Sequence, residues 1–316
     1  MTFDRRASTP PLAVHLLREG IVESTHLCQA VVADARGRPL SVAGNSETEA
    51  FIRSSLKPFQ ALAAMSSGVR ERFGLTDKDL AIMCGSHQGS ISHARQVFSM
   101  LWRADLEPEH LMCPVPYGKS SSLCHNCSGK HAGMLMAAKA RGWGLHDYLD
   151  RQHPVQQLVQ SHLTELLRMP AVELLAARDD CGAPTYQLQL GHMATLYAHL
   201  AAGQRADLEA IARAMFQQPE MVSGPGRFDT EVMKLTMGEV ISKSGGEGIQ
   251  CLSRMGEGLG LAIKVADGSS RAKYALALHL MRQLGWISVA MADELAETFC
   301  QVGPFTRLEV EGDISV

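Results

Sequence analysis

An α/β fold is predicted for this chain of 316 residues, with one sheet made by both ends of the chain and a helical portion beside it. Two observations predict it. Short β-rich segments lie before about residue 57 and after about residue 238, and apolar residues recur every three to four positions between them. This order indicates a sheet completed by the two terminal segments. We expect a single compact unit over 1–316, with the sheet at about 10–57 and 238–316 and a helical insertion at about 58–237.

The terminal segments hold the predicted strands. Residues 26–33 are β-rich, and residues 34–39 have turn composition ahead of a short strand at 40–42, which together predict a hairpin. After Gly238 the chain shows strand patterns and then two helical patterns. The strands are expected at 239–242, 248–252 and 259–265, and the helices at about 271–283 and 289–299.

Helices are predicted through the middle of the chain. Pro58 disfavours helix at the residue before it, so a tight turn is expected to lead into a helix from about Pro58 through Arg72. Other segments show the same apolar spacing, at 91–104, 128–141, 154–168, 190–202, 206–217 and 228–236. Loops rich in Gly, Ser and Pro separate them, at 84–90, 114–122 and 223–226.

Composition excludes several classes of protein. Hydrophobic residues make up 46% and charged residues 20%, as in ordinary globular proteins. A formal charge of −3, with no basic stripe interleaved with aromatics, argues against nucleic-acid binding. No run approaches the roughly 20 apolar residues that cross a bilayer. Residues 1–6 show no apolar signal core and the eight cysteines are sparse, so we expect a cytoplasmic protein.

Ser54 and Lys57 form the first candidate catalytic pair. A serine hydroxyl needs a proton acceptor within hydrogen-bond reach to act as a nucleophile, and a neutral lysine can be that acceptor. Residues three apart lie on one face of a helical turn, so this spacing brings Ser54 and Lys57 together and directs Ser55 elsewhere. Ser-x-x-Lys also occurs by chance in many chains, so the pair alone is a weak signal.

Two glycine-containing loops carry a second serine and a second lysine. Ser86 lies in Cys-Gly-Ser-His-Gln-Gly at 84–89, and Lys243 lies in Ser-Lys-Ser-Gly-Gly-Glu-Gly at 242–248. Glycines allow a tight, exposed loop and close approach of a substrate to the backbone. A plain turn is the alternative for either loop taken alone.

A candidate metal site involves Cys127, Lys130 and Cys181. In Asn-Cys-Ser-Gly-Lys-His-Ala-Gly at 126–133, Ser128 is a plausible N-cap, which places Cys127 and Lys130 one helical turn apart. Two thiolates and a neutral amine would leave the fourth position of a tetrahedral zinc ion open. Asp179 could orient a ligand or bound water.

A structural zinc module or a redox pair is the alternative for the cysteines at 124 and 127, which form a C-x-x-C. The second half of a zinc module is missing, and no thioredoxin-like βαβ unit surrounds them. Cys124 is therefore treated as incidental.

Together these segments resemble one family, the Rhizobium etli-type (class 3) L-asparaginases. The resemblance spans about residues 15–275 and rests on the segments 53–60, 84–87, 126–133 and 180–184, together with His26, Asp34 and the segments 226–230, 243–248 and 264–268. It implies a fold like the serine β-lactamases and glutaminases, an α/β sandwich with a helical portion, usually as a homodimer.

The resemblance also implies an activity and a set of site residues. The activity is hydrolysis of L-asparagine to L-aspartate and ammonia by two Ser-Lys tandems, Ser54 with Lys57 and Ser86 with Lys243. Zinc would be held by Cys127, Lys130 and Cys181 and would assist substrate binding. The candidates for substrate contact are Arg53, Asp179, Arg227 and His131, although both arginines could instead be surface cations. Asp180 stands where a glycine is expected, and residues 302–310 match nothing in the family pattern.

The resulting hypothesis has Ser54 attacking the side-chain amide with Lys57 as base, while Ser86 and Lys243 relay protons. Which serine attacks first stays open, as does activity on glutamine. Two alternatives remain. One is a β-lactamase or penicillin-binding relative, since Lys-Ser-Gly at 243–245 resembles Lys-Thr-Gly, although its Ser-Asp-Asn element is missing. The other is a non-catalytic, zinc-dependent ligand-binding protein on the same fold.

Overall fold

The computed structural model describes residues 9–315, and its internal contacts divide the chain into two units. Unit 1 contains residues up to Ser55 together with Leu188–Gly203 and Glu231–Val316, and unit 2 contains Leu56–Gln187 and Gln204–Thr230. The residues 1–6 used to predict location lie outside the described part of the chain. Among residues 9–315, none of the helices is long and apolar enough to cross a membrane.

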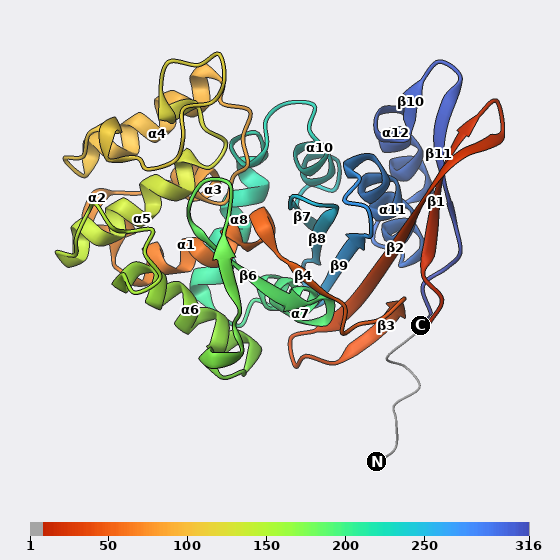
Figure 1. Ribbon diagram of the computed structural model, residues 1–316, viewed down its shortest axis with the longest axis horizontal. Helices are drawn as coiled ribbons and strands as arrows, with labels where there is room; N and C mark the ends of the chain where they lie inside the picture. Colours follow the sequence, from red (N-terminus) through yellow and green to blue (C-terminus); the bar gives the residue numbers. More distant parts are fainter. Residues whose placement is uncertain (1–8, 316) are drawn as a thin grey trace. The chain divides into compact units, whose positions relative to one another are not determined.

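Unit 1 is built on an antiparallel sheet to which both ends of the chain contribute, so the predicted α/β class is confirmed. Its path runs β10-β11-β1-β2-β9-β8-β7, and β3 pairs with β2 beside it. Figure 1 shows the first strand, in red, beside the last, in blue, as their antiparallel register requires. The strands are β1 (Leu12–Arg18), β2 (Ile21–Asp34), β3 (Pro39–Ala43), β7 (Val240–Ser244), β8 (Ile249–Arg254), β9 (Leu259–Val265), β10 (Gln301–Gly303) and β11 (Thr306–Glu311). A further short strand of this unit is β4 (Glu49–Phe51).

Helices cover the middle of this sheet. Successive residues of β8 and β9 are buried, as expected when both faces of a sheet are covered. α7 (Leu190–Ala201) packs on β2, β8 and β9, and α11 (Ser270–Gln283) packs on β8, β9 and β11 beside α12 (Val289–Phe299). Gly260 permits the close contact with α7, because a Cβ there would lie 2.0 Å from the carbonyl oxygen of Ala194. The predicted hairpin at 26–42 is confirmed as β2 and β3.

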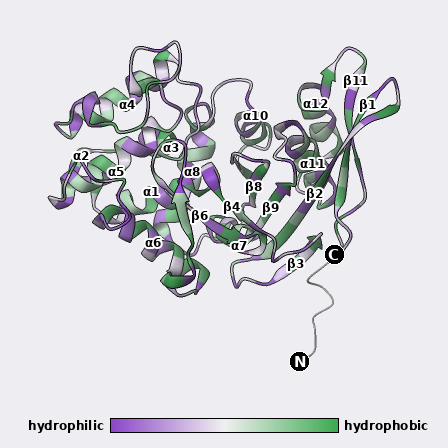
Figure 2. Cartoon of the chain, in the orientation of Figure 1, coloured by the Kyte–Doolittle hydropathy of each residue, from purple (hydrophilic) through white to green (hydrophobic). Residues whose placement is uncertain are grey.

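Unit 2 is mostly helical, and α4 carries hydrophobic and hydrophilic residues in alternating bands (Figure 2). Its helices are α1 (Lys57–Ser66), α2 (Val69–Phe73), α3 (Asp77–Met83), α4 (Ile91–Arg103), α5 (Ser128–Arg141), α6 (Pro154–Leu167), α8 (Ala206–Gln217) and α9 (Pro219–Val222). Its short elements are η2 (Pro108–His110), η3 (Ser122–Cys124), η4 (Ala171–Glu173) and β5 (Ala176–Arg178), which pairs with β6 (Pro184–Gln189). η1 (Arg53–Leu56) and α10 (Phe228–Leu235) span the unit boundaries.

Two sequence predictions about helices are wrong in detail. The helix expected from Pro58 through Arg72 is two helices, because Gly68 adopts the left-handed φ of +75° between α1 and α2. Ser128 is also not an N-cap. Cys127 holds that position without a side-chain cap, and the Ser128 hydroxyl instead lies 2.8 Å from the carbonyl oxygen of Leu123.

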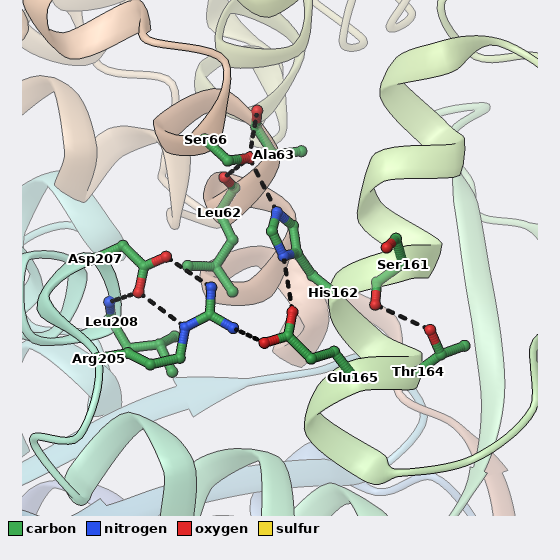
Figure 3. A network of polar contacts seen from close by, with 10 residues as sticks. All are labelled: Leu62, Ala63, Ser66, Ser161, His162, Thr164, Glu165, Arg205, Asp207 and Leu208. Atoms are coloured by element: carbon green, nitrogen blue, oxygen red, sulfur yellow. Dashed lines mark hydrogen bonds and ion pairs between the residues drawn. The ribbon is translucent and has the colours of Figure 1, made fainter.

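A polar network joins α1, α6 and the start of α8 in unit 2 (Figure 3). His162 Nε2 lies 2.9 Å from Ser66 Oγ, whose hydroxyl donates to the carbonyl oxygen of Leu62 at 2.8 Å. Because that hydroxyl is already donating, it accepts from His162 Nε2. Nδ1 of His162 has no hydrogen-bond partner and lies 3.9 Å from Glu165, and Arg205 bridges Glu165 to Asp207.

This network predicts a loss of stability in acid. Burial, followed by the Arg205 cation, lowers the pKa of His162 below its ordinary value of 6.5. The unfolded chain therefore binds the proton more readily, so the free energy of unfolding should fall as pH drops through 6.5 and should stop falling below the folded pKa. Urea unfolding at several pH values measures this. His162→Gln, whose amide can still donate to Ser66, should show a smaller acid loss.

Exposed His146 supplies the matched control. His146→Gln should lose as much stability in acid as the unmodified chain. Equal acid losses for His162→Gln and His146→Gln would contradict the role given to the buried network.

Candidate active site

Lys57 and Ser86 meet inside unit 2. Lys57 begins α1, and its side chain is 0% exposed. Its Nζ lies 2.9 Å from Ser86 Oγ and donates to the carbonyl oxygens of Gly85 at 2.5 Å and Asn126 at 3.4 Å. The structure therefore places Lys57 beside a serine 29 residues further along the chain. A buried amine in contact with a hydroxyl can exchange a proton with it.

The loop that carries Ser86 is fixed by close backbone contacts. The Ser86 amide donates to the carbonyl oxygen of Val222 at 2.7 Å. At Gly85 a Cβ would lie 2.7 Å from the carbonyl oxygen of Met221, and at Gly89, where φ is +64°, it would lie 2.1 Å from that of Cys124. The glycines of this loop thus let it pack tightly against its neighbours.

In unit 1, the hydroxyl of Ser55 is occupied. Its Oγ donates to the carbonyl oxygen of Lys243 at 2.9 Å, and Tyr197 Oη donates to the carbonyl oxygen of Ser55 at 2.8 Å. Ser54 is half-buried, and it follows Arg53, whose φ of +53° is uncommon outside glycine. Strained backbone of this kind is typical of functional sites. Because the hydroxyl of Ser55 is occupied, Ser54 is the candidate nucleophile of this turn.

Lys243 lies buried in β7, with its backbone paired opposite Cys251 on β8. Its Nζ donates to the carbonyl oxygen of Ser244 at 2.7 Å. The predicted tandem of Ser86 with Lys243 is not tested by these contacts and stays a prediction.

A cluster of two thiols and one amine lies in unit 2. Cys127 is the N-cap of α5, Lys130 lies in its first turn, and Cys181 lies in the turn between β5 and β6. Lys130 Nζ lies 3.0 Å from Cys181 Sγ, and Cys127 and Cys181 share a hydrogen bond. Exposure is 4% for Cys127, 4% for Lys130 and 2% for Cys181, so the cluster is shielded from solvent.

The charges of this cluster depend on each other. The hydrogen bond from Cys181 holds the pKa of Cys127 well below 9.0, and the same bond raises the pKa of Cys181. Burial opposes a charge on Lys130, but the two sulfurs outweigh it and raise the pKa of that amine. Lys57 also acts on Cys127, which links this cluster to the Lys57–Ser86 pair.

Two of the remaining predicted residues lie near this cluster. Asp179 is half-buried, and its charge acts on Lys130. His131 is 0% exposed on α5. Arg227, in contrast, is exposed, and so is Asp180.

Sequence reasoning missed three residues that support this region. His87 Nε2 lies 3.2 Å from Ser128 Oγ, which joins the Ser86 loop to the start of α5. The amide of Cys127 donates to Nδ1 of His125 at 3.1 Å. Tyr148 Oη lies 2.7 Å from Nδ1 of His131. His87 lies in the segment 84–87 and His125 lies between the cysteines at 124 and 127, so the sequence placed both near candidate site residues. Nothing in the sequence indicated a role for Tyr148.

The chain belongs to the L-asparaginase II family, because the family profile of that description matches residues 14–316. This confirms the predicted family and places the chain among the amidohydrolases. None of the curated proteins matches the sequence significantly.

Solved structures give only distant likenesses. A β-lactamase from Mycobacterium bovis is 15% identical, with 86% of this chain and 95% of that chain covered and a TM-score of 0.46. EstCE1, a hydrolase with promiscuous acyltransferase activity, is 12% identical, with coverage of 85% and 92% and a TM-score of 0.36. Because both scores lie below 0.5, we draw nothing about function from them.

Proposed function

We propose that the chain hydrolyses the side-chain amide of L-asparagine to L-aspartate and ammonia, with Ser54 as nucleophile and Lys57 as its base. The observation that carries the serine–lysine chemistry is the buried Lys57 amine 2.9 Å from Ser86 Oγ, in a chain of the L-asparaginase II family. The pairing of Lys57 with Ser54 rests on their spacing in the sequence. A serine and a lysine can cleave an amide without a histidine, provided that the amine is neutral when the hydroxyl attacks.

The proposed steps use the groups of one helical turn and one loop. Ser54 Oγ bonds to the amide carbon while its proton passes to neutral Lys57. Lys57 then returns this proton through Ser86 to the leaving nitrogen, the C–N bond breaks, and ammonia departs. Water attacks the resulting aspartyl ester, its proton passes to Ser54, and L-aspartate is released. Ser55 is not assigned this role, because its hydroxyl donates to the carbonyl of Lys243.

The two sulfurs and one nitrogen of Cys127, Lys130 and Cys181 converge in a shielded cluster, and these three residues would hold a zinc ion once Lys130 had lost its proton. Among residues 9–315, no group of three His, Cys, Asp or Glu side chains could hold a metal, so any such site depends on the lysine. When bound, zinc would act as a Lewis acid toward a substrate oxygen or nitrogen. Contact of Arg53, Asp179, Arg227 and His131 with the substrate, and assembly as a homodimer, remain part of the proposal.

Trapping the covalent intermediate tests the assignment of the two serines. Ser86→Ala removes the proton relay but not the nucleophile, so kcat should fall by about 10²- to 10³-fold. Mass spectrometry of the unmodified chain, quenched during turnover of L-asparagine, should find an aspartyl ester on the peptide that contains Ser54, and Ser86→Ala should contain less of it because the acylation step is slower. Ser120→Ala changes an exposed serine of the same unit and should turn over normally. An ester found on Ser86 in the unmodified chain would reverse the two roles.

A further inference from the structure

A short hydrogen-bond chain ends on the imidazole of His131 in unit 2. His131 and Tyr148 are each 0% exposed. Tyr148 Oη lies 2.9 Å from the backbone nitrogen of Met112 and 2.7 Å from Nδ1 of His131, and the two rings meet edge to face. The phenol therefore links a backbone amide to one nitrogen of the imidazole.

The direction of these bonds places the proton of the imidazole. The Met112 amide can only donate, so Tyr148 Oη accepts from it and the phenol O–H remains to donate to Nδ1. A ring nitrogen that accepts a hydrogen bond carries no proton, so the imidazole has a single N–H. Since Nδ1 accepts, the single N–H of His131 is on Nε2.

That N–H is a buried donor in a charged environment. Across residues 9–315, Nε2 of His131 is one of a few buried side-chain nitrogens or oxygens that find no hydrogen-bond partner. Buried polar groups are nearly always paired, so this one calls for an acceptor. The charges that act on His131 come from Lys130, Cys127, His125 and Lys57, all of them in the candidate site.

We propose that Tyr148 is a positioning residue, which holds His131 as an Nε2–H donor for a carboxylate oxygen of the amino-acid substrate. This inference rests on the proposed function. A carboxylate is the favoured acceptor because the positive charge of Lys130, next to His131 on α5, stabilises an anion beside it. Tyr148 acts through His131 and does not itself contact the substrate.

Nitrogen NMR of the full chain, labelled in its histidines, tests the proton position directly. His131→Gln identifies the His131 signals by their loss. The unmodified chain should show Nδ1 of His131 unprotonated and Nε2 protonated, and added L-aspartate should shift the Nε2–H proton downfield. Tyr148→Phe should move the Nδ1 signal, because the phenol no longer donates to it. An Nδ1–H form in the unmodified chain would overturn the role of Tyr148 whatever the activity.

Kinetics then separate positioning from a structural role. His131→Phe should raise KM for L-asparagine about ten- to hundredfold, the value of a hydrogen bond to a charged group, and His131→Gln should recover part of this loss. Tyr148→Phe should raise KM about three- to tenfold and leave kcat within about twofold. Tyr186→Phe, at another buried tyrosine of the unit, should change neither.

The outcomes distinguish this inference from the proposed function. An unchanged KM in Tyr148→Phe, with an unchanged Nδ1 signal, would overturn the inference alone. If the chain releases no ammonia from L-asparagine but shows the Nε2–H form and the shift with L-aspartate, the proposed function fails and the role of Tyr148 stands.

Discussion

Lys57→Met is expected to lower kcat for L-asparagine by about 10⁴-fold, the scale seen when one member of a catalytic unit is removed. The amine is buried, lies 2.9 Å from Ser86 Oγ and donates to two backbone carbonyls, so no water-exposed group can replace it as the base. Methionine has a similar length and fills the same space without charge. Ammonia release under substrate saturation measures the loss.

Two controls distinguish loss of the base from a folding defect in Lys57→Met. Lys119→Met removes an exposed lysine of the same unit and should leave kcat unchanged. Circular dichroism of Lys57→Met should show the fold of the unmodified chain, and urea unfolding should show a loss of about 1–3 kcal/mol, because the carbonyls of Gly85 and Asn126 lose a donor. A well-folded Lys57→Met protein with kcat within tenfold of normal would exclude Lys57 as the base.

The fold was predictable where local periodicity decides the structure. The helices expected at 91–104, 128–141 and 154–168 end within one residue of α4, α5 and α6, because each carries apolar residues at helical spacing. The strand expected at 259–265 is β9. α3 and the strands β10 and β11 were missed. These segments are short, and their pairing or packing depends on residues distant in the sequence.

The residues of the candidate site could be predicted from sequence motifs, but most of the contacts between them could not. Glycine-flanked Ser86 and the thiols at 127 and 181 were visible in the sequence. The contact of Lys57 with Ser86 was not, because spacing reports only neighbours on one turn, whereas this contact depends on how the loop after α3 lies against α1. The hydroxyl of Ser128 contacts His87 and the carbonyl of Leu123, so it is not available to cap α5.

Gly129→Ala should destabilise the chain by about 3 kcal/mol and disturb the thiol–amine cluster. A Cβ at 129 would lie 2.2 Å from the carbonyl oxygen of Ile82 on α3, and a backbone oxygen inside a packed unit cannot move aside. Alanine favours helix by about 1 kcal/mol over glycine, and overpacking of this severity exceeds that gain. The first turn of α5 must shift, and it carries Lys130. Urea unfolding measures the loss of stability.

Gly133→Ala on the same helix is the matched control. Its Cβ would meet the flexible end of Met83, with Cε at 2.7 Å, so the neighbour can rotate away. The gain in helix propensity should then largely offset the contact, leaving stability within about 1 kcal/mol. Equal losses of stability in Gly129→Ala and Gly133→Ala would show that the close backbone contact of α5 with α3 does not cause the loss in Gly129→Ala.

Ammonia release from L-asparagine by the purified full chain tests the central claim most directly, with nitrocefin as the competing substrate. The account predicts steady ammonia release, with equimolar L-aspartate, that is lost in Lys57→Met, and no hydrolysis of nitrocefin. Nitrocefin turnover without ammonia would instead indicate a β-lactamase-like hydrolase. Tight binding of L-asparagine with no ammonia formed would indicate a ligand-binding protein, and either result would contradict the proposed function.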